Sequence, residues 1–347
     1  MNTESMLKRL SIVKIQEEAN KIKLFYLQEE KEKIQYKAGQ YLTFILPQSE
    51  HEIRRSYSLV SSPGIDEQLC IAVKRIQNGV FSRHLFDRAQ IGDQLITLGA
   101  GGVFVLPDDI GNYETLFFFA AGSGIVPVFS LIKTALILHP YLRIALIYSN
   151  SSAPATLFRE PLKRLAEAHA ARFTIDFIFS NAKHLEKAHL QPHLIEQFVA
   201  RYRGGTDGRT LYYICGPDSY MRMCTFTLRR LEVPSGNIKK EIFNVTKPVQ
   251  SLVPPDTAPH TVTLLRGQEQ HSLLVQHPDS ILMVAKQKGI LLPYSCQVGR
   301  CGNCIAKCEK GQVWMSYNEV LTEKEILNGY ILTCTGYPIG GDAIIRY

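Results

Sequence analysis

Four cysteines near the C-terminus stand at spacings that suit an iron–sulfur cluster. Cys296, Cys301 and Cys304 form a C-x4-C-x2-C run, and Cys334 follows after 29 intervening residues. Two irons bridged by two sulfides need four thiolate ligands, and this spacing is typical of plant-type [2Fe–2S] sites. The pattern therefore predicts a one-electron carrier of low potential, near roughly −400 mV.

Two glycines inside this run, Gly299 and Gly302, would let the backbone curl closely around a cluster. A four-cysteine zinc site is the alternative, but such sites usually pair two short C-x2-C units, and only one is present here. Cys308 could compete as a ligand, although the strand-like run 305–308 favours a packed thiol. Two further cysteines are expected to be buried apolar residues: Cys70 and Cys224.

A second chemical motif follows the apolar run 115–120. The chain continues with Gly122-Ser123-Gly124 and then Pro127, at the start of an expected helix. Glycines allow a phosphate to approach backbone N–H groups closely, and a helix N-terminus adds a favourable dipole. The segment predicts a loop that binds the pyrophosphate of a nucleotide, although a plain strand–helix turn explains a lone G-x-G about as well.

This loop departs from the dinucleotide fingerprint of NAD-binding Rossmann folds. Pro127 stands where the third glycine would be, and no Asp or Glu ends the next expected strand. Ser149 and Asn150 follow that strand instead, which leaves room for the 2′-phosphate of NADPH. Arg159 or Lys163 could neutralise this phosphate. NADPH is therefore favoured, with NADH as the alternative.

These motifs need secondary structure to hold them in place. Residues 1–107 contain short alternating or β-branched runs separated by Gly, Pro and Asp turns, which predicts a small antiparallel barrel. The expected strands include 41–46, 56–60, 69–76 and 94–98.

Residues 108–246 alternate strand-like runs with helix-length stretches, which predicts an α/β domain with a parallel sheet. The expected strands are 115–120, 143–148, 173–179 and 210–214, and the expected helices are 126–138, 157–169, 194–201 and 221–231. Four prolines within 247–259 predict a semi-rigid linker. Residues 260–347 then form a small third domain around the cysteine run.

The composition suits a soluble globular protein, with 45% hydrophobic and 20% charged residues. The formal net charge of +7 is spread thinly, without the dense basic stripe of a nucleic-acid-binding protein, and could steer an acidic partner. The apolar stretch 116–138 is interrupted by glycines, Pro127 and Lys133, so no membrane insertion is expected. Without a secretory signal, eight cysteines favour redox or metal chemistry in the cytoplasm.

Further motifs, taken in order, resemble the ferredoxin–NADP reductase superfamily with a C-terminal plant-type ferredoxin domain. Arg55-Ser56-Tyr57-Ser58 matches the R-x-Y-S flavin motif of that superfamily. The resemblance implies that Arg55 meets the flavin phosphates, that Tyr57 packs on the isoalloxazine ring and that Ser58 approaches its N5 atom. It covers nearly the whole chain, and within the superfamily the chain is most similar to phenylacetyl-CoA epoxidase reductase components.

Several other segments carry the same resemblance. Residues that match the segment around the flavin pyrophosphate are Lys74, Gly79, Val80, Phe81 and Ser82. Residues that match the end of the barrel are Gly92, Asp93, Gly102 and Phe104. Each short motif has an ordinary structural explanation by itself, and it is their order along the chain that identifies the superfamily.

The nucleotide motifs follow the same order. The segment from Gly122 to Pro127 matches the superfamily's own G-x-G-x-x-P loop, which accounts for the missing third glycine. Cys215-Gly216-Pro217 matches a C-G-P motif whose cysteine lies near the nicotinamide, and Glu241 with Phe243 matches an E-x-F segment close to the flavin. Ser151 stands where relatives often carry an arginine for the 2′-phosphate, which keeps NADH open.

The resemblance implies three domains: an antiparallel flavin-binding β-barrel, an α/β nucleotide-binding domain with a parallel sheet, and an α+β ferredoxin domain of the β-grasp type. It favours FAD over FMN. Electrons would pass from NAD(P)H through the flavin to the [2Fe–2S] cluster and on to an oxygenase, with Ser58, Cys215 and Glu241 at the hydride-transfer site. The alternatives are the reductase of a Rieske-type oxygenase or fatty-acid desaturase, and a non-catalytic redox sensor.

Overall fold

The computed structural model describes most of the chain, namely residues 7–19, 21–30, 32–47, 52–182, 188–203, 209–243 and 252–347. The chain divides into two compact units, Met1–Glu241 and Ile242–Tyr347. Within the described residues, no helix is both long enough and apolar enough to cross a membrane.

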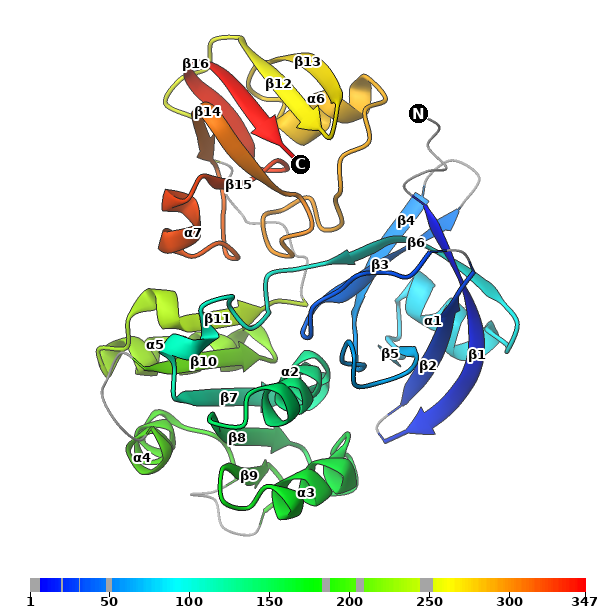
Figure 1. Ribbon diagram of the computed structural model, residues 1–347, viewed down its shortest axis with the longest axis vertical. Helices are drawn as coiled ribbons and strands as arrows, with labels where there is room; N and C mark the ends of the chain where they lie inside the picture. The colour runs from blue at the N-terminus through cyan, green and yellow to red at the C-terminus, as the bar shows by residue number, and fades with distance from the viewer. Residues whose placement is uncertain are drawn as a thin grey trace. The chain divides into compact units, whose positions relative to one another are not determined.

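The first unit begins with a closed antiparallel sheet (Figure 1). Its strands, in the order β4-β3-β6-β1-β2-β5, are β1 (Lys8–Glu18), β2 (Ile22–Glu29), β3 (Tyr41–Pro47), β4 (Glu52–Ser58), β5 (Leu69–Lys74) and β6 (Gln94–Gly101). An antiparallel bridge between Leu59 and Ile71 joins the two edge strands, which closes the sheet into the predicted barrel. The expected strands overlap those observed, although β4 begins earlier and ends earlier than expected.

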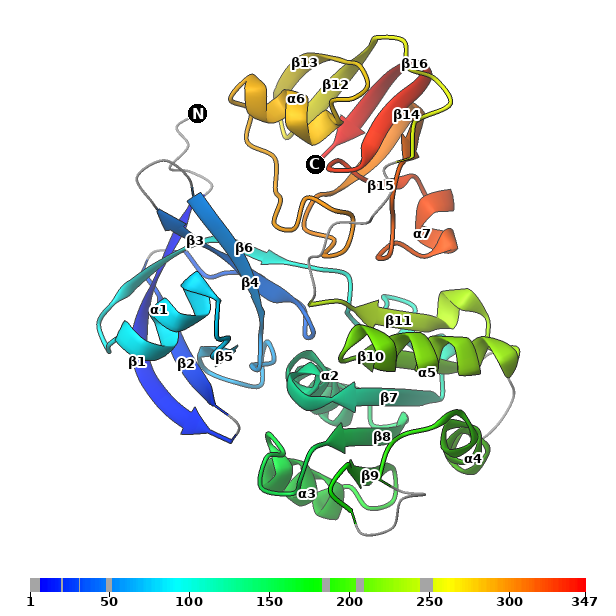
Figure 2. The same cartoon turned by 180° about the vertical axis from the view of Figure 1, so that it is seen from behind.

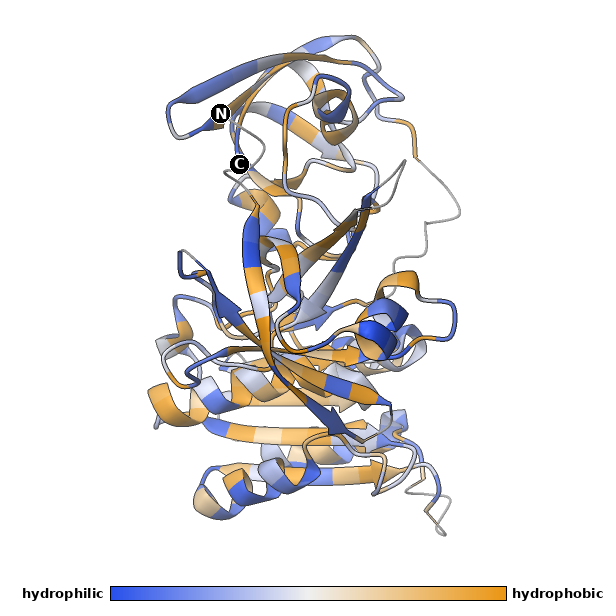
Figure 3. Ribbon diagram, turned by 90° about the vertical axis from the view of Figure 1, so that its right-hand side faces the viewer, coloured by the Kyte–Doolittle hydropathy of each residue, from blue (hydrophilic) through white to orange (hydrophobic). Residues whose placement is uncertain are grey.

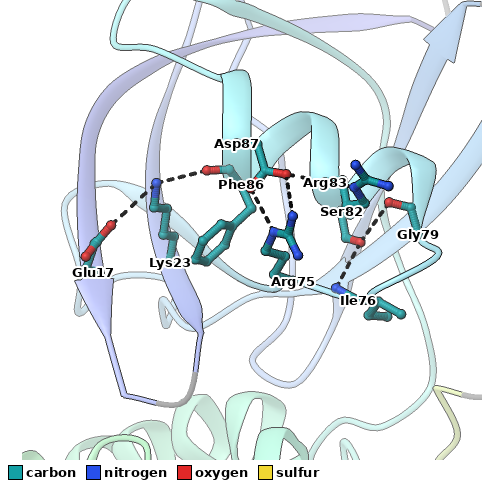
Figure 4. A network of polar contacts seen from close by, with 9 residues as sticks. All are labelled: Glu17, Lys23, Arg75, Ile76, Gly79, Ser82, Arg83, Phe86 and Asp87. Atoms are coloured by element: carbon teal, nitrogen blue, oxygen red, sulfur yellow. Dashed lines mark hydrogen bonds and ion pairs between the residues drawn. The ribbon is translucent and has the colours of Figure 1, made fainter.

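Helix α1 (Val80–Arg88) fills one side of the barrel and is fastened to it by polar contacts (Figure 4). Lys23 Nζ donates to the Phe86 carbonyl at 2.9 Å, and Arg75 forms a bidentate pair with Asp87 at 2.8 and 3.0 Å. Ser82 Oγ donates to the Gly79 carbonyl at 3.2 Å. These contacts fix the turn that leads into the helix.

The rest of the first unit is an α/β layer whose sheet is wholly parallel, as predicted. Its strands, in the order β11-β10-β7-β8-β9, are β7 (Thr115–Ala121), β8 (Arg143–Asn150), β9 (Phe173–Phe179), β10 (Thr210–Cys215) and β11 (Ile238–Glu241). Its helices are α2 (Ile125–Leu138), α3 (Arg159–Ala168), α4 (Pro192–Tyr202) and α5 (Asp218–Arg230), with short 3-10 turns η2 (Ile110–Asn112), η3 (Gly122–Gly124) and η5 (Ser235–Asn237). Figures 1 and 2 show α2 and α3 on one face and α4 and α5 on the other.

Both faces of this sheet are covered, so its central strands are apolar almost throughout (Figure 3). Residues 116–120 of β7 are fully buried, for example. The chain runs from β7 outward to β8 and β9 and then returns to the other side of β7 as β10. Right-handed crossovers in these two directions place the helices on opposite faces, so the carboxyl ends of β7 and β10 form a topological switch point.

The second unit is a mixed five-stranded sheet with one packed helix, which agrees with the predicted β-grasp domain. The order β13-β12-β16-β14-β15 comprises β12 (His260–Arg266), β13 (Glu269–Val275), β14 (Ile305–Met315), β15 (Tyr330–Leu332) and β16 (Gly336–Arg346). Helix α6 (Ile281–Gln287) packs its apolar residues into the core, and α7 (Glu323–Leu327) is a short turn of helix with a capping box.

The predicted linker, 247–259, is described from residue 252 onward, and 247–251 lie outside the described residues. Asp256 accepts hydrogen bonds from the N–H groups of Ala258 at 2.9 Å and Gly340 at 2.7 Å, and pairs with His260 at 2.6 Å. These bonds, first among them that from Gly340, lower the pKa of Asp256 to about 2. The C-terminal part of the predicted linker is therefore attached to the second unit.

Candidate functional site

The loops after β7 and β10 meet at the switch point of the parallel sheet. A Cβ atom placed on Gly124 would lie 2.2 Å from the carbonyl oxygen of Cys215 and 2.9 Å from the nitrogen of Gly216. Only glycine allows this approach, because any side chain would collide with backbone atoms that cannot move aside. The structure therefore brings together the two motifs that were predicted to bind the nucleotide.

The first of these loops leaves one side open. Gly122 adopts a left-handed conformation with φ of 54°, and no atom lies within 4 Å of the position of its Cβ. Gly122, Ser123 and Gly124 form η3, which continues directly into α2. The first N–H groups of such a run have no partner within the helix, so they suit an anionic ligand. Pro127 is buried in the first turn of α2, where its missing N–H costs nothing.

Three predicted residues converge beside this loop, although they lie far apart in the sequence. Cys215 and Glu241 are paired in register across the parallel strands β10 and β11. Ser58, at the end of β4, donates from its Oγ to Glu241 Oε1 at 3.2 Å. All three side chains are buried. The carboxyl edge of the sheet thus meets the end of a barrel strand.

Burial decides the protonation of this group. It raises the pKa of Glu241 to about 8, against a smaller lowering by the Ser58 hydrogen bond. Burial, and then the nearby Glu241, also raise the pKa of the Cys215 thiol. Glu241 can therefore hold a proton at neutral pH. Its Oε2 atom is buried without a hydrogen-bond partner in the described residues, which fits a polar group of a bound flavin or nicotinamide.

The R-x-Y-S motif lies on β4 with alternate side chains on one side. Arg55 is exposed, with Nη1 donating to the Arg54 carbonyl at 2.7 Å. The ring of Tyr57 is half-buried, with its centroid 5.8 Å from that of Phe81 and 6.2 Å from that of Phe44. Phe81 is itself buried in the barrel core, so it supports Tyr57 from beneath.

The other residues predicted to surround the flavin phosphates frame the start of α1. Lys74 is exposed at the end of β5, and Gly79 precedes the helix. A Cβ on Gly79 would lie 2.3 Å from Ser82 Oγ, so this turn also requires glycine. Ser82 is buried, and its Oγ accepts from the N–H of Ile76 at 3.4 Å.

The residues predicted near the adenosine end lie at the carboxyl end of β8. Ser149 and Asn150 are half-buried there. Arg159 and Lys163, the two candidate cations, each lie 3.3 Å from the same Glu160 oxygen. One carboxylate is shared by two cations, which leaves a net positive charge at this end. Phe243 follows β11 and is exposed, at the start of the second unit.

Sequence reasoning missed the contacts that join the barrel to the α/β layer within the first unit. Ser130 in α2 donates to the Ser61 carbonyl at 2.7 Å, and Ser62 donates to the Ser130 carbonyl at 3.0 Å. Lys133 pairs with Asp66 alongside them. These serines carry no motif, so only the folded structure reveals that they hold Ser58 against Glu241.

In the second unit, the four predicted cluster ligands form two pairs. Cys304 and Cys334 have their Sγ atoms 3.1 Å apart, and both are free thiols. Cys296 and Cys301 form the other pair, in which the N–H of Cys296 donates to Cys301 Sγ at 3.5 Å. Gly299 and Gly302 both have φ of 74°, as the predicted curl of this loop requires.

This two-plus-two arrangement suits two irons better than one zinc ion. Among the described residues, no three His, Cys, Asp or Glu side chains gather around a point that could hold a single metal ion. The Cys301 thiol and then the N–H groups of the loop lower the pKa of Cys296 to about 6, so the loop favours a thiolate. Cys308 lies on β14, where its thiol contacts the carbonyls of Lys310 and Gly311 at 3.4 and 3.7 Å.

Comparisons with known proteins agree with this arrangement. Three family profiles match the chain: an oxidoreductase FAD-binding domain at 9–105, an oxidoreductase NAD-binding domain at 118–225 and a 2Fe-2S iron-sulfur cluster binding domain at 265–338. The ferredoxin reductase component of 3-ketosteroid-9-alpha-monooxygenase from Mycolicibacterium smegmatis is 30% identical, over 91% of this chain and 88% of its own length. The chain belongs to this ferredoxin reductase family. It is an oxidoreductase of FAD, a nicotinamide nucleotide and a [2Fe–2S] cluster.

Other relatives of this ferredoxin reductase confirm the predicted superfamily and fold. One component of the 1,2-phenylacetyl-CoA epoxidase from Escherichia coli is 29% identical, over 91% of this chain and 90% of its own length. The structure of phthalate dioxygenase reductase matches with a TM-score of 0.61 at 23% identity, over 99% of both chains. An intact type IV self-sufficient cytochrome P450 monooxygenase matches with a TM-score of 0.72 at 19% identity, over 98% of this chain and 41% of its own.

Proposed function

We propose that this ferredoxin reductase takes electrons from NAD(P)H at the Ser58–Cys215–Glu241 group and delivers them through its cluster to an oxygenase component. The observation that carries the proposal is the buried, protonated Glu241, bonded to Ser58 and in register with Cys215 at the switch point. Bound FAD accepts a hydride from the nicotinamide and releases the electrons singly, as a [2Fe–2S] cluster requires.

The barrel residues would hold and orient the flavin. Arg55 and Ser82 would bind its phosphates, with Lys74 adding positive charge and Gly79 keeping the turn tight. Tyr57 would pack against the ring, because its own ring is half-buried on the rigid support of Phe81. Ser58 would donate a hydrogen bond near the reacting edge, and the protonated Glu241 would keep an anion away from a site that accepts hydride.

The nucleotide would bind across the switch point. Residues with backbone groups for the pyrophosphate and nicotinamide are Gly122, Ser123, Gly124, Pro127, Cys215, Gly216 and Pro217. Ser149 and Asn150 would hold the adenosine ribose, and the two cations that share Glu160 would bind a 2′-phosphate. This charge supports NADPH, with NADH as the alternative. Phe243, which is exposed, would cover a flavin edge.

The acceptor is proposed from the relatives. They include reductases of a steroid monooxygenase and an epoxidase, together with the glycine betaine monooxygenase reductase subunit of Pseudomonas aeruginosa, 25% identical over 90% of this chain. An oxygenase is thus the acceptor class, either an epoxidase of the phenylacetyl-CoA type or a Rieske-type oxygenase. We place the reaction in the cytoplasm and expect no nucleic-acid partner.

We propose domain boundaries at 1–107, 108–246 and 260–347, with 247–259 as the linker that lets the ferredoxin domain move between flavin and acceptor. A rigid helical spacer in place of the linker should slow cluster reduction in stopped-flow measurements. Unchanged kinetics would exclude this role of the linker.

The central test is anaerobic titration of the purified protein with NADPH and with NADH, followed by visible spectroscopy. We expect flavin and cluster bands that bleach in turn, with NADPH acting at lower concentration. Addition of candidate oxygenase components should then restore NAD(P)H-dependent turnover. A protein whose flavin is not bleached by either nucleotide would instead be a redox sensor, and the proposal would be wrong.

A further inference from the structure

The hydroxyl of Tyr148 is a buried polar group with no role in the site as proposed so far. Tyr148 lies in β8 and is fully buried. Its Oη lies 3.0 Å from the carbonyl oxygen of Gly122 and 3.3 Å from that of Leu157, and the side chain of Asn150 also contacts it. A phenol donates a single proton, so the proton serves two carbonyls, with the shorter bond to the nucleotide loop.

The bond to Gly122 controls the direction of a peptide plane. The Gly122 carbonyl also accepts from the N–H of Ile125, so two donors hold it against the protein. The Gly122–Ser123 peptide is trans, and in a trans peptide the carbonyl and the following N–H point in opposite directions. The N–H of Ser123 must then point away from Tyr148, on the side from which an anion can approach.

Without the hydroxyl, nothing in the side chain of Gly122 would select this orientation. Gly122 adopts φ of 54° with open space around its Cβ position, and glycine populates positive and negative φ about equally. A rotation of the peptide would turn a carbonyl oxygen, instead of an N–H, toward the pyrophosphate. Tyr148 therefore acts through the backbone of another residue.

We propose that Tyr148 is a positioning residue for the nucleotide: its hydroxyl fixes the Gly122–Ser123 peptide so that the Ser123 N–H donates to the pyrophosphate of NAD(P)H. The inference rests on the proposed role of the Gly122–Gly124 loop. It assigns to β8 a part in nucleotide binding that no motif in the sequence marks.

The test is Tyr148→Phe in the full chain with its flavin and cluster. The Kd of the oxidised nucleotide, by calorimetry, and the KM of its reduced form should both rise about fivefold, the size expected from one neutral hydrogen bond. The kcat should stay unchanged. Reduction of the flavin by 1-benzyl-1,4-dihydronicotinamide, which carries no phosphate, should proceed at the wild-type rate.

Tyr213→Phe is the matched control. Tyr213 is as deeply buried, and its hydroxyl donates to the Val105 carbonyl at 2.9 Å, away from the loop. It should lose comparable thermal stability with no change in Kd. An unchanged Kd in Tyr148→Phe, an equal change in both variants, or slower reduction by the benzyl compound in Tyr148→Phe would each overturn the proposal.

Ser123→Pro separates this proposal from the role of the loop itself, because proline has no N–H. It should weaken nucleotide binding, and adding Tyr148→Phe should weaken it no further, since both changes remove the same bond. A Ser123→Pro variant with wild-type Kd would mean that the loop does not bind the nucleotide. Additive effects would mean that the loop binds it but that Tyr148 does not act through Ser123.

Discussion

The two redox sites of this ferredoxin reductase are built in opposite ways. The cluster site takes three of its four ligands from one loop, whose shape depends on left-handed glycines and local N–H groups. The hydride-transfer site takes Ser58, Cys215 and Glu241 from three strands that are far apart in the sequence. A local site should fail locally, whereas an assembled site should fail with the packing that brings its parts together.

The largest effect is expected at the local site. Cys334→Ser removes one thiolate of the Cys304–Cys334 pair, and the cluster content should fall below about a tenth of the wild-type value. Bound FAD and NAD(P)H-dependent ferricyanide reduction should persist, since neither needs the second unit. Visible absorption and the EPR signal of the reduced cluster measure the loss. Cys308→Ser is the control and should keep its cluster; loss in that variant would assign Cys308 as a ligand.

The assembled site should instead be sensitive to backbone packing. Gly124→Ala places a Cβ 2.2 Å from the Cys215 carbonyl oxygen, so the two loops must separate. We expect a destabilisation of about 2 kcal/mol, typical of overpacking, with weaker nucleotide binding and slower flavin reduction at once. Thermal melting and calorimetry measure these effects. Gly111→Ala, where no atom lies within 4 Å of the new Cβ, should be neutral. Tight binding by Gly124→Ala would show that the approach is not required.

A smaller effect concerns the charge state of the assembled site. Glu241 keeps its proton up to about pH 8 in the folded protein, while its ordinary pKa is 4.5. Between these values only the unfolded chain releases the proton, so the free energy of unfolding should fall as pH rises, by up to about 1.4 kcal/mol per pH unit. Glu241→Gln should lack this slope, so that it gains on the wild type between pH 5 and 8 in urea unfolding. Parallel curves for the two proteins would contradict the buried, protonated state. Glu160→Gln, an exposed change, should follow the wild type.

The same contrast explains what the sequence could predict. Cys296, Cys301 and Cys304 could be identified from spacing alone, because a local loop leaves a local pattern. Ser58 and Glu241 could be placed together only through resemblance to a superfamily, since no spacing encodes a contact between a barrel strand and the edge of a parallel sheet.

Features without a motif were not predictable. The bonds among Ser61, Ser62 and Ser130 depend on how the barrel docks on α2, and the Tyr148 hydroxyl depends on a peptide orientation. The predicted strands and helices were largely confirmed because apolar periodicity reports burial. Their ends shifted by a few residues, since caps and turns are set by the folded environment.

The smallest predicted effect tests whether the local site is tuned from outside its own loop. Arg300 lies between two cluster ligands in the sequence and pairs with Glu319 at 3.1 Å, with both side chains largely buried. Glu319→Gln leaves the Arg300 charge uncompensated, which should stabilise the more negative reduced cluster and raise its potential by about 20–50 mV. Arg300→Gln should lower the potential instead. EPR-monitored redox titration measures both shifts, with Glu309→Gln as the control, because Glu309 pairs with Arg346 on the neighbouring strand. Shifts of the same sign in both variants would mean that the loop has merely loosened, since only a charge effect reverses with the sign of the removed group.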